Sequence, residues 1–341
     1  MNFSKIIMSG LIFLSAHLAV AAEQAQTPVA VPQELKTRLT TTALLPNFGQ
    51  IKYRGPLKQN NGPVVALFHG VYGGASHLSF RNLIDSLDSR GARVYVMDLP
   101  GTGQSDYNEY RNGQKGAIRK KYSAQLLQSF VVEFTKTVLR EPAILVGQAT
   151  ISMPVLAASK QLGDLAKSVV LLSPAGVNVL SAKPSHQQKL FGRFLRLFES
   201  QLNDFYMNQL LSEENIYGSV ANGLFDKSLV TETFLTEYKL GRNYLNQKWI
   251  SLSFVEGRLS YDFASASKGV NKPVLMIFGK EDVGISISDG DGNINNTSPD
   301  READFAAIRP DFQYVTLANT ASILWIEKAD IVSDEILKTV Q

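Results

Sequence analysis

The amino-acid sequence predicts an α/β fold, in which helices cover both faces of a mostly parallel central sheet and a mainly helical segment is inserted. Short apolar runs such as 64–68 and 94–97 lack polar alternation, which is typical of strands covered on both faces. Helical patterns separate these runs, and this alternation favours right-handed strand–helix–strand crossovers. From residue 177 to 266 the strand-like runs disappear and aromatic-rich segments replace them. A chain of 341 residues can hold one large domain with such an insertion.

The N-terminal residues 1–22 have the pattern of a secretory signal. Lys5 precedes an apolar run at 6–14, and small residues at 19–22 form a cleavage site. The apolar run is short for a membrane span, so we expect an exported chain, periplasmic or secreted, with no span after cleavage. Residues 23–46, rich in Ala, Gln, Thr and Pro, are expected to form a flexible tether.

Composition limits the partners that this chain can have. The formal net charge is only +3, which does not favour nucleic acid, so no nucleic-acid partner is expected. The chain has no cysteine, which excludes disulfides, thiolate nucleophiles and cysteine-ligated metals. We expect no cofactor.

The first part of the core is predicted to span residues 47–176. An alternating segment at 48–53 indicates an opening strand, and the helical spacing over 80–90 indicates a helix that Gly91 ends. Ser123 is expected to cap a second helix. Two more apolar runs, at 143–146 and 169–172, predict further buried strands.

Residues 177–266 are predicted to form a helical cap, and residues 267–341 to complete the core. The aromatic stripe at 191–198 is interpreted as a helix face packed on the main domain. Strands are expected at 274–278 and 312–317, and a closing helix at 331–340.

Four landmarks lie at the ends of these predicted strands. They are His69-Gly70, a D-x-x-G-x-G-x-S turn at 98–105, the strand–turn–helix containing Gly147–Ile151, and Phe278–Asp282. Their order and spacing resemble the α/β-hydrolase superfamily, from about residue 48 to the end of the sequence. The resemblance implies that Gly147–Ile151 stands at the G-x-S-x-G nucleophile elbow and that the helical insertion is a cap.

The same resemblance implies a degenerate catalytic triad. Ala149 stands at the nucleophile position, and a methyl group cannot attack a carbonyl. Ser322 stands where the family has its histidine, and no histidine follows the acid position Asp282. Without a functional nucleophile to hold, the turn at Ala149 is expected to relax.

The expected ligand site is apolar, and the backbone N–H groups of Val71 and Thr150 are its candidate oxyanion-type donors. The residues expected to line or support this site are His69, Gly70, Val71, Tyr72, Ala149, Thr150, Ser322 and Ile323.

Other polar residues are interpreted as structural. Thr150 and Ser152 flank the elbow and Ser76 precedes His77, but neighbours on a turn point in different directions, so none simply replaces the nucleophile. Asp98 and Asp106 are expected to form turns. A D-x-D-x-N pattern makes Asp289, Asp291 and Asn293 a weak calcium candidate, but Ile294 stands where the calcium loop needs glycine, so no metal is expected.

Three functions remain open from the sequence. The first is a non-hydrolytic pseudoenzyme that binds a small apolar or ester-like ligand, or a protein partner through the cap. The second is an enzyme of atypical mechanism, lyase-like or an unusual esterase, that uses His69 or His77 with Asp282 in the same site. The third is an inactive structural member of a secreted assembly.

Overall fold

The computed structural model describes residues 39–57, 60–71, 75–105, 122–177, 190, 213–240, 250, 253, 256–282, 288–289, 292–293 and 298–341. The expected signal, residues 23–38 of the expected tether and most of the expected cap lie outside these ranges. Within them, no helix has the length and apolar character needed to cross a bilayer.

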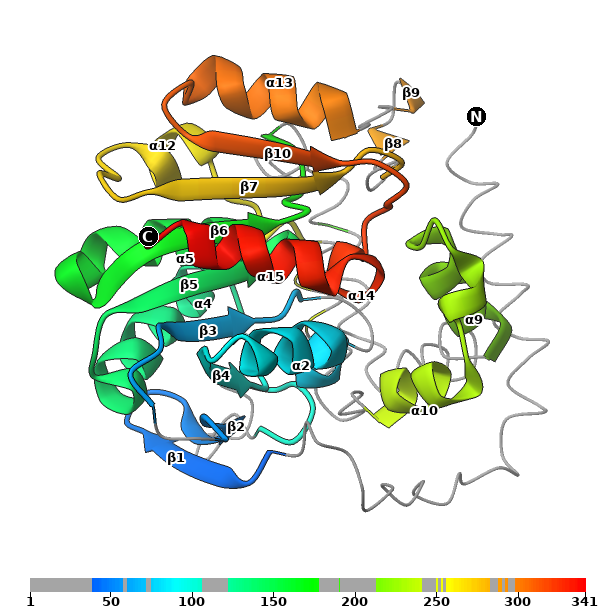
Figure 1. The fold of residues 1–341 in the computed structure, drawn as a ribbon. Coiled ribbons are helices and arrows are strands. Elements are labelled where there is room, and N and C mark those ends of the chain that lie inside the picture. Colours follow the sequence, from blue (N-terminus) through cyan, green and yellow to red (C-terminus); the bar gives the residue numbers. More distant parts are fainter. Residues whose placement is uncertain are drawn as a thin grey trace.

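An eight-stranded sheet forms the centre of the molecule, in the order β1-β2-β4-β3-β5-β6-β7-β10 (Figure 1). Strands β1 and β2 pair antiparallel with each other, and β2 pairs antiparallel with β4. All pairs from β4 to β10 are parallel, which confirms the mostly parallel sheet. The strands are β1 (Thr41–Leu45), β2 (Gly49–Arg54), β3 (Val64–Phe68), β4 (Arg93–Met97), β5 (Ala143–Gln148), β6 (Ala166–Leu172), β7 (Val274–Gly279) and β10 (Gln313–Leu317), beside a separate pair, β8 (Ser288–Asp289) and β9 (Gly292–Asn293).

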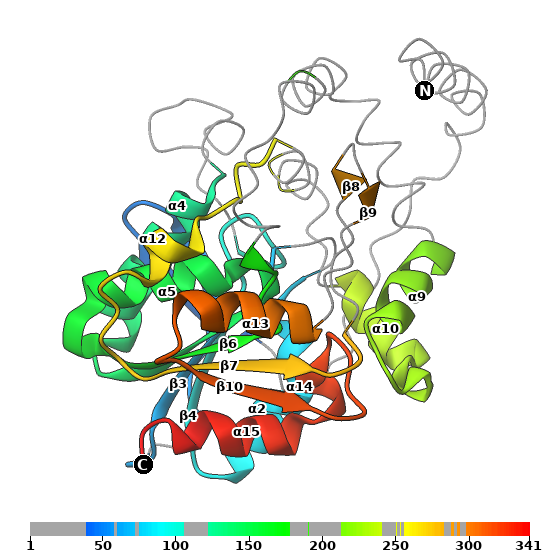
Figure 2. The same ribbon diagram turned by 90° about the horizontal axis from the view of Figure 1, so that it is seen from above.

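Helices cover both faces of this sheet, as predicted. Figure 2 shows α2, α14 and α15 on one side and α4, α5, α12 and α13 on the other. The α-helices are α2 (Arg81–Ser89), α4 (Ala124–Phe134), α5 (Ser152–Leu162), α9 (Glu213–Asn222), α10 (Glu232–Leu240), α12 (Phe263–Ser267), α13 (Ser298–Ile308), α14 (Leu324–Glu327) and α15 (Ala329–Lys338). Shorter turns are η2 (His77–Phe80), the π-helical η3 (Thr135–Leu139), η4 (Ala149–Ile151), η5 (Gly163–Leu165) and η7 (Lys227–Leu229).

Two hydrophobic cores result from the two helical layers. Val65 and Leu67 of β3 belong to the core shared with α2 and α15, whereas Phe68 belongs to the core shared with α4 and α5. The Phe68 ring meets Phe130 and Phe134 of α4 edge to face, with ring centroids 6.4 and 6.2 Å apart. Alternate residues of one strand therefore bury apolar area on opposite faces, which explains its continuous apolar sequence.

The expected tether is too long at its C-terminal end. Residues 41–45 form the edge strand β1, and Leu39 and Leu45 are buried. Most of this strand is exposed, and its sequence Thr-Thr-Ala-Leu-Leu has no long apolar run. Pairing with β2, rather than burial of its own side chains, holds β1 in the sheet.

Within the range expected to form a cap, the structure describes helices α9 and α10. Both lie beyond the carboxyl ends of the parallel strands (Figures 1 and 2). The aromatic stripe at 191–198 lies outside the described residues. A helical cap is compatible with these two helices, and its full extent stays a prediction.

Candidate functional site

Unusual backbone conformations gather at the carboxyl ends of the parallel strands. In the described part of the chain, four non-glycine residues have a positive φ, and three of them follow β5, β6 and β10: Ala149, Ser173 and Asn319. Strained residues of this kind concentrate at functional sites. The carboxyl edge of an open parallel sheet is also where ligands bind in such folds.

The elbow after β5 keeps its sharp geometry, so the predicted relaxation of this turn is wrong. Ala149 has a φ of +49°, in the left-handed region. A Cβ built on Gly147 would lie 3.0 Å from the Val155 side chain and 3.1 Å from the Ser152 backbone. The close packing of α5 on the end of β5 therefore fixes the turn, whatever residue occupies position 149. Ala149 is partly exposed whereas Gln148 and Thr150 are buried, so Ala149 is the accessible residue of the elbow.

Two backbone donors beside the elbow, the N–H groups of Gly70 and Val71, are bonded to side chains. The Val71 N–H donates to the Thr150 hydroxyl at 2.7 Å, and the Gly70 N–H donates to Gln148 Oε1 at 3.0 Å. The Val71 N–H, one of the two predicted oxyanion-type donors, is thus bonded to the side chain that follows the nucleophile position, whereas the donor role of the Thr150 N–H stays a prediction. Tyr72 lies outside the described residues.

The acid position is neutralised by an arginine that the sequence analysis missed. Asp282 follows β7 and forms an ion pair with the Arg301 guanidinium of α13, and both side chains are almost fully buried. Arg301 Nη1 also donates to the Pro174 carbonyl at 3.3 Å. The sequence feature that could have revealed this arginine is its spacing of four residues from Phe305. On a helix this spacing places both side chains on one face, which in α13 is buried.

The histidine position is covered by the turn that follows α9. The Ser322 hydroxyl donates to the Gly223 carbonyl at 3.2 Å, and the Ile323 N–H donates to the same oxygen at 2.9 Å. A Cβ on Gly223 would come within 2.8 Å of Ile323 Cδ1, so a larger residue at position 223 would displace the Ile323 side chain. Ser322 therefore holds the α9 turn in place rather than activating a nucleophile.

Glu327 of α14 strengthens the same junction. Its Oε1 accepts the N–H groups of Phe225 and Asp226 at 2.6 and 2.9 Å, and its Oε2 accepts the Ala321 N–H at 2.7 Å. One carboxylate thus joins the turn after α9 to the loop after β10.

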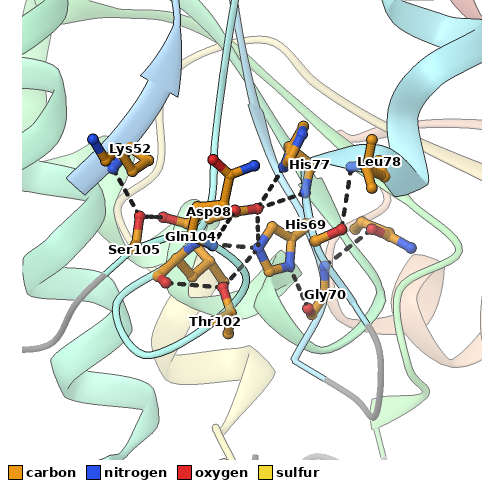
Figure 3. A network of polar contacts seen from close by, with 12 residues as sticks. Lys52, His69, Gly70, His77, Leu78, Asp98, Thr102, Gln104 and Ser105 are labelled. Carbon is orange, nitrogen blue, oxygen red and sulfur yellow. Dashed lines mark hydrogen bonds and ion pairs between the residues drawn. The ribbon is translucent and has the colours of Figure 1, made fainter. Parts of the chain in front are cut away.

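A buried polar network lies beneath the loop that follows β3 (Figure 3). His69 Nε2 accepts the Leu99 N–H at 3.1 Å, so the ring proton lies on Nδ1, which donates to the Gly70 carbonyl at 2.8 Å. Burial lowers the pKa of His69 to about 4, despite the opposing effect of the nearby Asp98 carboxylate. His69 is therefore neutral near pH 7, and both of its ring nitrogens hold the backbone.

Asp98 is the centre of this network and does more than form a turn. Its carboxylate accepts the His77 N–H at 2.9 Å, contacts His77 Nδ1 at 2.8 Å and accepts the Gln104 N–H at 2.7 Å. Burial raises the pKa of Asp98, but the charge and hydrogen bond of His77 outweigh it, so the net pKa is lower than usual. The Ser105 hydroxyl extends the network by donating to the Asp98 carbonyl and accepting the Lys52 N–H of β2. Asp106 lies outside the described residues.

The remaining polar candidates have structural contacts. Ser76 Oγ accepts the Leu78 N–H at 3.3 Å and caps η2, and the Ser152 hydroxyl donates to the Gly147 carbonyl at 3.2 Å. Asp289 pairs with Gly292 in the β8–β9 ladder, as in a hairpin, while Asp291 lies outside the described residues. In the part of the chain that is described, no three His, Asp or Glu side chains gather as metal ligands would.

Comparison with known proteins places this geometry in a family. A model of the alpha/beta hydrolase fold matches residues 63–303. The chain belongs to the α/β-hydrolase fold family. The Bacillus subtilis (strain 168) protein described as uncharacterized hydrolase YugF is 28% identical over 232 residues, which cover 67% of this chain and 75% of that protein.

Solved structures of family members share the fold. The enol-lactonase from Burkholderia xenovorans LB400 superposes with a TM-score of 0.63 at 17% identity, over 88% of this chain and 99% of the other. A serine-to-alanine mutant of the meta-cleavage product hydrolase CumD from Pseudomonas fluorescens IP01, complexed with acetates, gives a TM-score of 0.62 at 17% identity, over 88% and 97% of the two chains. At such identities the likeness concerns the fold of the α/β-hydrolase family, not the substrate.

His69 should make the stability of this α/β-hydrolase-fold protein depend on pH. Its folded pKa of about 4 lies below the value of about 6.5 in an unfolded chain. Between these values the unfolded state binds a proton that the folded state does not, so stability falls as the pH falls through this window. Urea denaturation should show that His69 accounts for a loss of about 2 kcal/mol between pH 7.5 and 4.5.

The matched variant for this measurement is His69→Gln, which cannot titrate. Its unfolding free energy should change less between the two pH values than that of the wild type, even though its stability at pH 7.5 is lower. Equal pH dependence in the two proteins would contradict the assignment of a neutral, buried His69.

Replacing Glu327 with Ala should loosen the turn after α9. The change removes the acceptor of three backbone N–H groups, at Phe225, Asp226 and Ala321, and should cost about 1–3 kcal/mol of stability. Limited proteolysis should cleave the α9–α10 region faster in this variant. Glu232→Ala, at an exposed position of α10, is the control and should leave the cleavage rate unchanged.

Proposed function

We propose that this chain is a non-hydrolytic member of the α/β-hydrolase fold family, a pseudoenzyme that binds a small apolar or ester-like ligand. The observation that carries the proposal is Ala149, whose methyl occupies the accessible position of a sharply turned elbow. A methyl group cannot form an acyl intermediate. Loss of the nucleophile alone lowers the kcat of a serine protease by about 10⁶-fold.

The two other triad positions support the same conclusion. Ser322 cannot act as a general base, and its hydroxyl is bonded to the Gly223 carbonyl. Asp282 is paired with Arg301, so its carboxylate is already engaged by a cation. Ser322 and Asp282 thus make contacts that stabilise the fold.

The alternative is an enzyme of atypical mechanism, such as a lyase or an unusual esterase. Its support is that the curated relative carries the description of a hydrolase. The contacts of His69 weigh against it as the base, because both of its ring nitrogens hold backbone groups that would have to be released before it could accept a proton. His77 contacts Asp98 through Nδ1, which leaves Nε2 able to accept a proton, so His77 is the candidate base of this alternative.

The location and the partner of the protein are part of the proposal. The signal-like residues 1–22 support action in the periplasm or outside the cell. A protein partner is the other candidate occupant of the cap, and its support is the exposure of two aromatic residues near α9, Tyr217 at 47% and Phe225 at 51%.

Ester turnover tests the proposal. Aryl esters with acyl chains of increasing length would be offered to the purified wild type and to Ala149→Gly, which removes the methyl at a position whose φ suits glycine. Both proteins should show the same rate as buffer. A wild-type rate above buffer would contradict the proposal, and Thr150→Ala and Ser152→Ala would then locate the substitute nucleophile.

Ligand binding is measured separately, by thermal shift with apolar alcohols and esters of matched chain length. A bound ligand should raise the Tm of the wild type in a concentration-dependent way. Ala149→Leu, which fills the accessible position of the elbow, should reduce this shift.

A further inference from the structure

The hydroxyl of Thr150 is held on both sides by one residue of the neighbouring loop. Thr150 Oγ1 accepts the Val71 N–H at 2.7 Å and donates to the Val71 carbonyl at 3.4 Å. Thr150 is 5% exposed and Val71 is 2% exposed. This reciprocal contact is therefore shielded from water. In the protein interior hydrogen bonds are stronger than in water and harder to exchange.

The Val71 amide lies beside the elbow because of the sheet register. Strand β3 runs parallel to β5, with Phe68 opposite Gly147, so the loops that follow these two residues leave the sheet together. A backbone N–H at this edge, next to the accessible residue of the elbow, can bind an oxygen of a ligand. In this protein the Thr150 hydroxyl supplies that oxygen.

The N–H of the preceding residue, Gly70, is also bonded to a side chain next to Ala149, that of Gln148. The Gly70 N–H donates to Gln148 Oε1 at 3.0 Å, so the residues before and after Ala149 satisfy two successive donors. Among the described residues, the buried Arg301 at this edge is paired with Asp282. A ligand oxygen would thus exchange one hydrogen bond for another, and a carboxylate would lose its hydration without gaining Arg301 as a counter-charge.

We propose that Thr150 is a specificity-determining residue that occupies the place of a ligand oxygen at the Val71 amide. The site therefore takes neutral, apolar ligands, which contact the Ala149 methyl, and rejects carboxylates and other oxyanions. This inference rests on the proposed function, because it concerns the ligand that a non-hydrolytic site binds.

The test compares acetate binding by the wild type, Thr150→Ala and Thr150→Ser. The protein would be labelled with ¹⁵N-valine, and the Val71 amide signal followed during titration with sodium acetate, with sodium chloride as the ionic-strength control. Thr150→Ala, which opens the amide, should show a saturable shift of the Val71 signal. The wild type and Thr150→Ser, which keeps the hydroxyl, should bind acetate at least about tenfold more weakly.

A second measurement keeps the proposal falsifiable if Thr150→Ala does not fold. In the wild type, the Val71 amide should exchange with deuterium slowly, because Thr150 holds it, and acetate should leave this rate unchanged. Acetate binding by the wild type as tight as by Thr150→Ala would overturn the proposal. So would a Val71 signal that acetate does not shift in folded Thr150→Ala, or fast exchange in the wild type.

These outcomes differ from failure of the proposed function. Acetate binding involves no turnover, so a hydrolytic wild type would be detected by its ester rate alone. A wild type that shows no ester turnover but binds acetate at Val71 would contradict this inference without contradicting the proposed function.

Discussion

Asp282→Ala is expected to lower the free energy of unfolding by about 3–5 kcal/mol, because it leaves the buried Arg301 guanidinium without its counter-charge. Both partners are almost fully buried, so water cannot solvate the orphaned cation. Arg301→Met should destabilise for the converse reason, because the buried Asp282 carboxylate loses its counter-charge. Urea denaturation at pH 7 measures both effects.

The double variant Asp282→Ala with Arg301→Met decides whether the pair itself is the cause. Removing both charges should recover most of the stability that either single change loses, since an apolar replacement of a buried ion pair is often close to neutral. Single and double variants that lose stability additively would contradict a coupled pair. The loss of Asp282 should therefore be detected first as a loss of folding stability.

Asp98→Ala is the second change with a large expected effect, about 3–4 kcal/mol of stability. It removes the acceptor shared by the His77 backbone, the His77 ring and the Gln104 backbone, all within 2.9 Å of the carboxylate. Each buried donor left without a partner keeps its desolvation cost. Chemical denaturation gives the size of the loss, and amide exchange at His77 and Gln104 should accelerate.

Two variants bracket this result. Asp98→Asn retains one acceptor oxygen and should lose less stability than Asp98→Ala. Asp164→Ala removes an exposed carboxylate whose partner is Lys272, and it should leave stability unchanged within error. If Asp98→Ala proved as stable as Asp164→Ala, the polar network would not hold the loop after β3.

The sequence predicted the elements whose signal is local. Continuous apolar runs located strands such as β3 and β5, and Ser123 was correctly placed as the cap of α4. The edge strand β1 was not predicted, because a half-exposed strand that pairs with only one neighbour has no such apolar run. Local patterns therefore located the core strands and missed an edge.

The sequence motifs correctly placed Ala149, Asp282 and Ser322 after strands β5, β7 and β10, but they did not predict the contacts of this region. Those contacts come from distant segments. Thr150 and Val71 are 79 residues apart, and Glu327 reaches Phe225 over 102 residues. The direction of a side chain at a strand end depends on which loops the sheet brings together, and no spacing in the sequence encodes that.

Helices α2 and α15 pack against each other, although they are synthesised at widely separated times. Arg90 at the end of α2 binds Asp330 and Asp334 of α15, 240 and 244 residues later, and Asn82 binds the Ile326 carbonyl, 244 residues later. At translation rates of about 5–20 residues per second, that separation amounts to roughly 10–50 s. During synthesis, α2 is therefore made long before α15. Its residues Leu83 and Leu87, which are buried in the complete fold, are not covered by α15 during this time. The nascent chain exposes an apolar face over this interval, and its folding is completed only after residues 324–338 leave the ribosome.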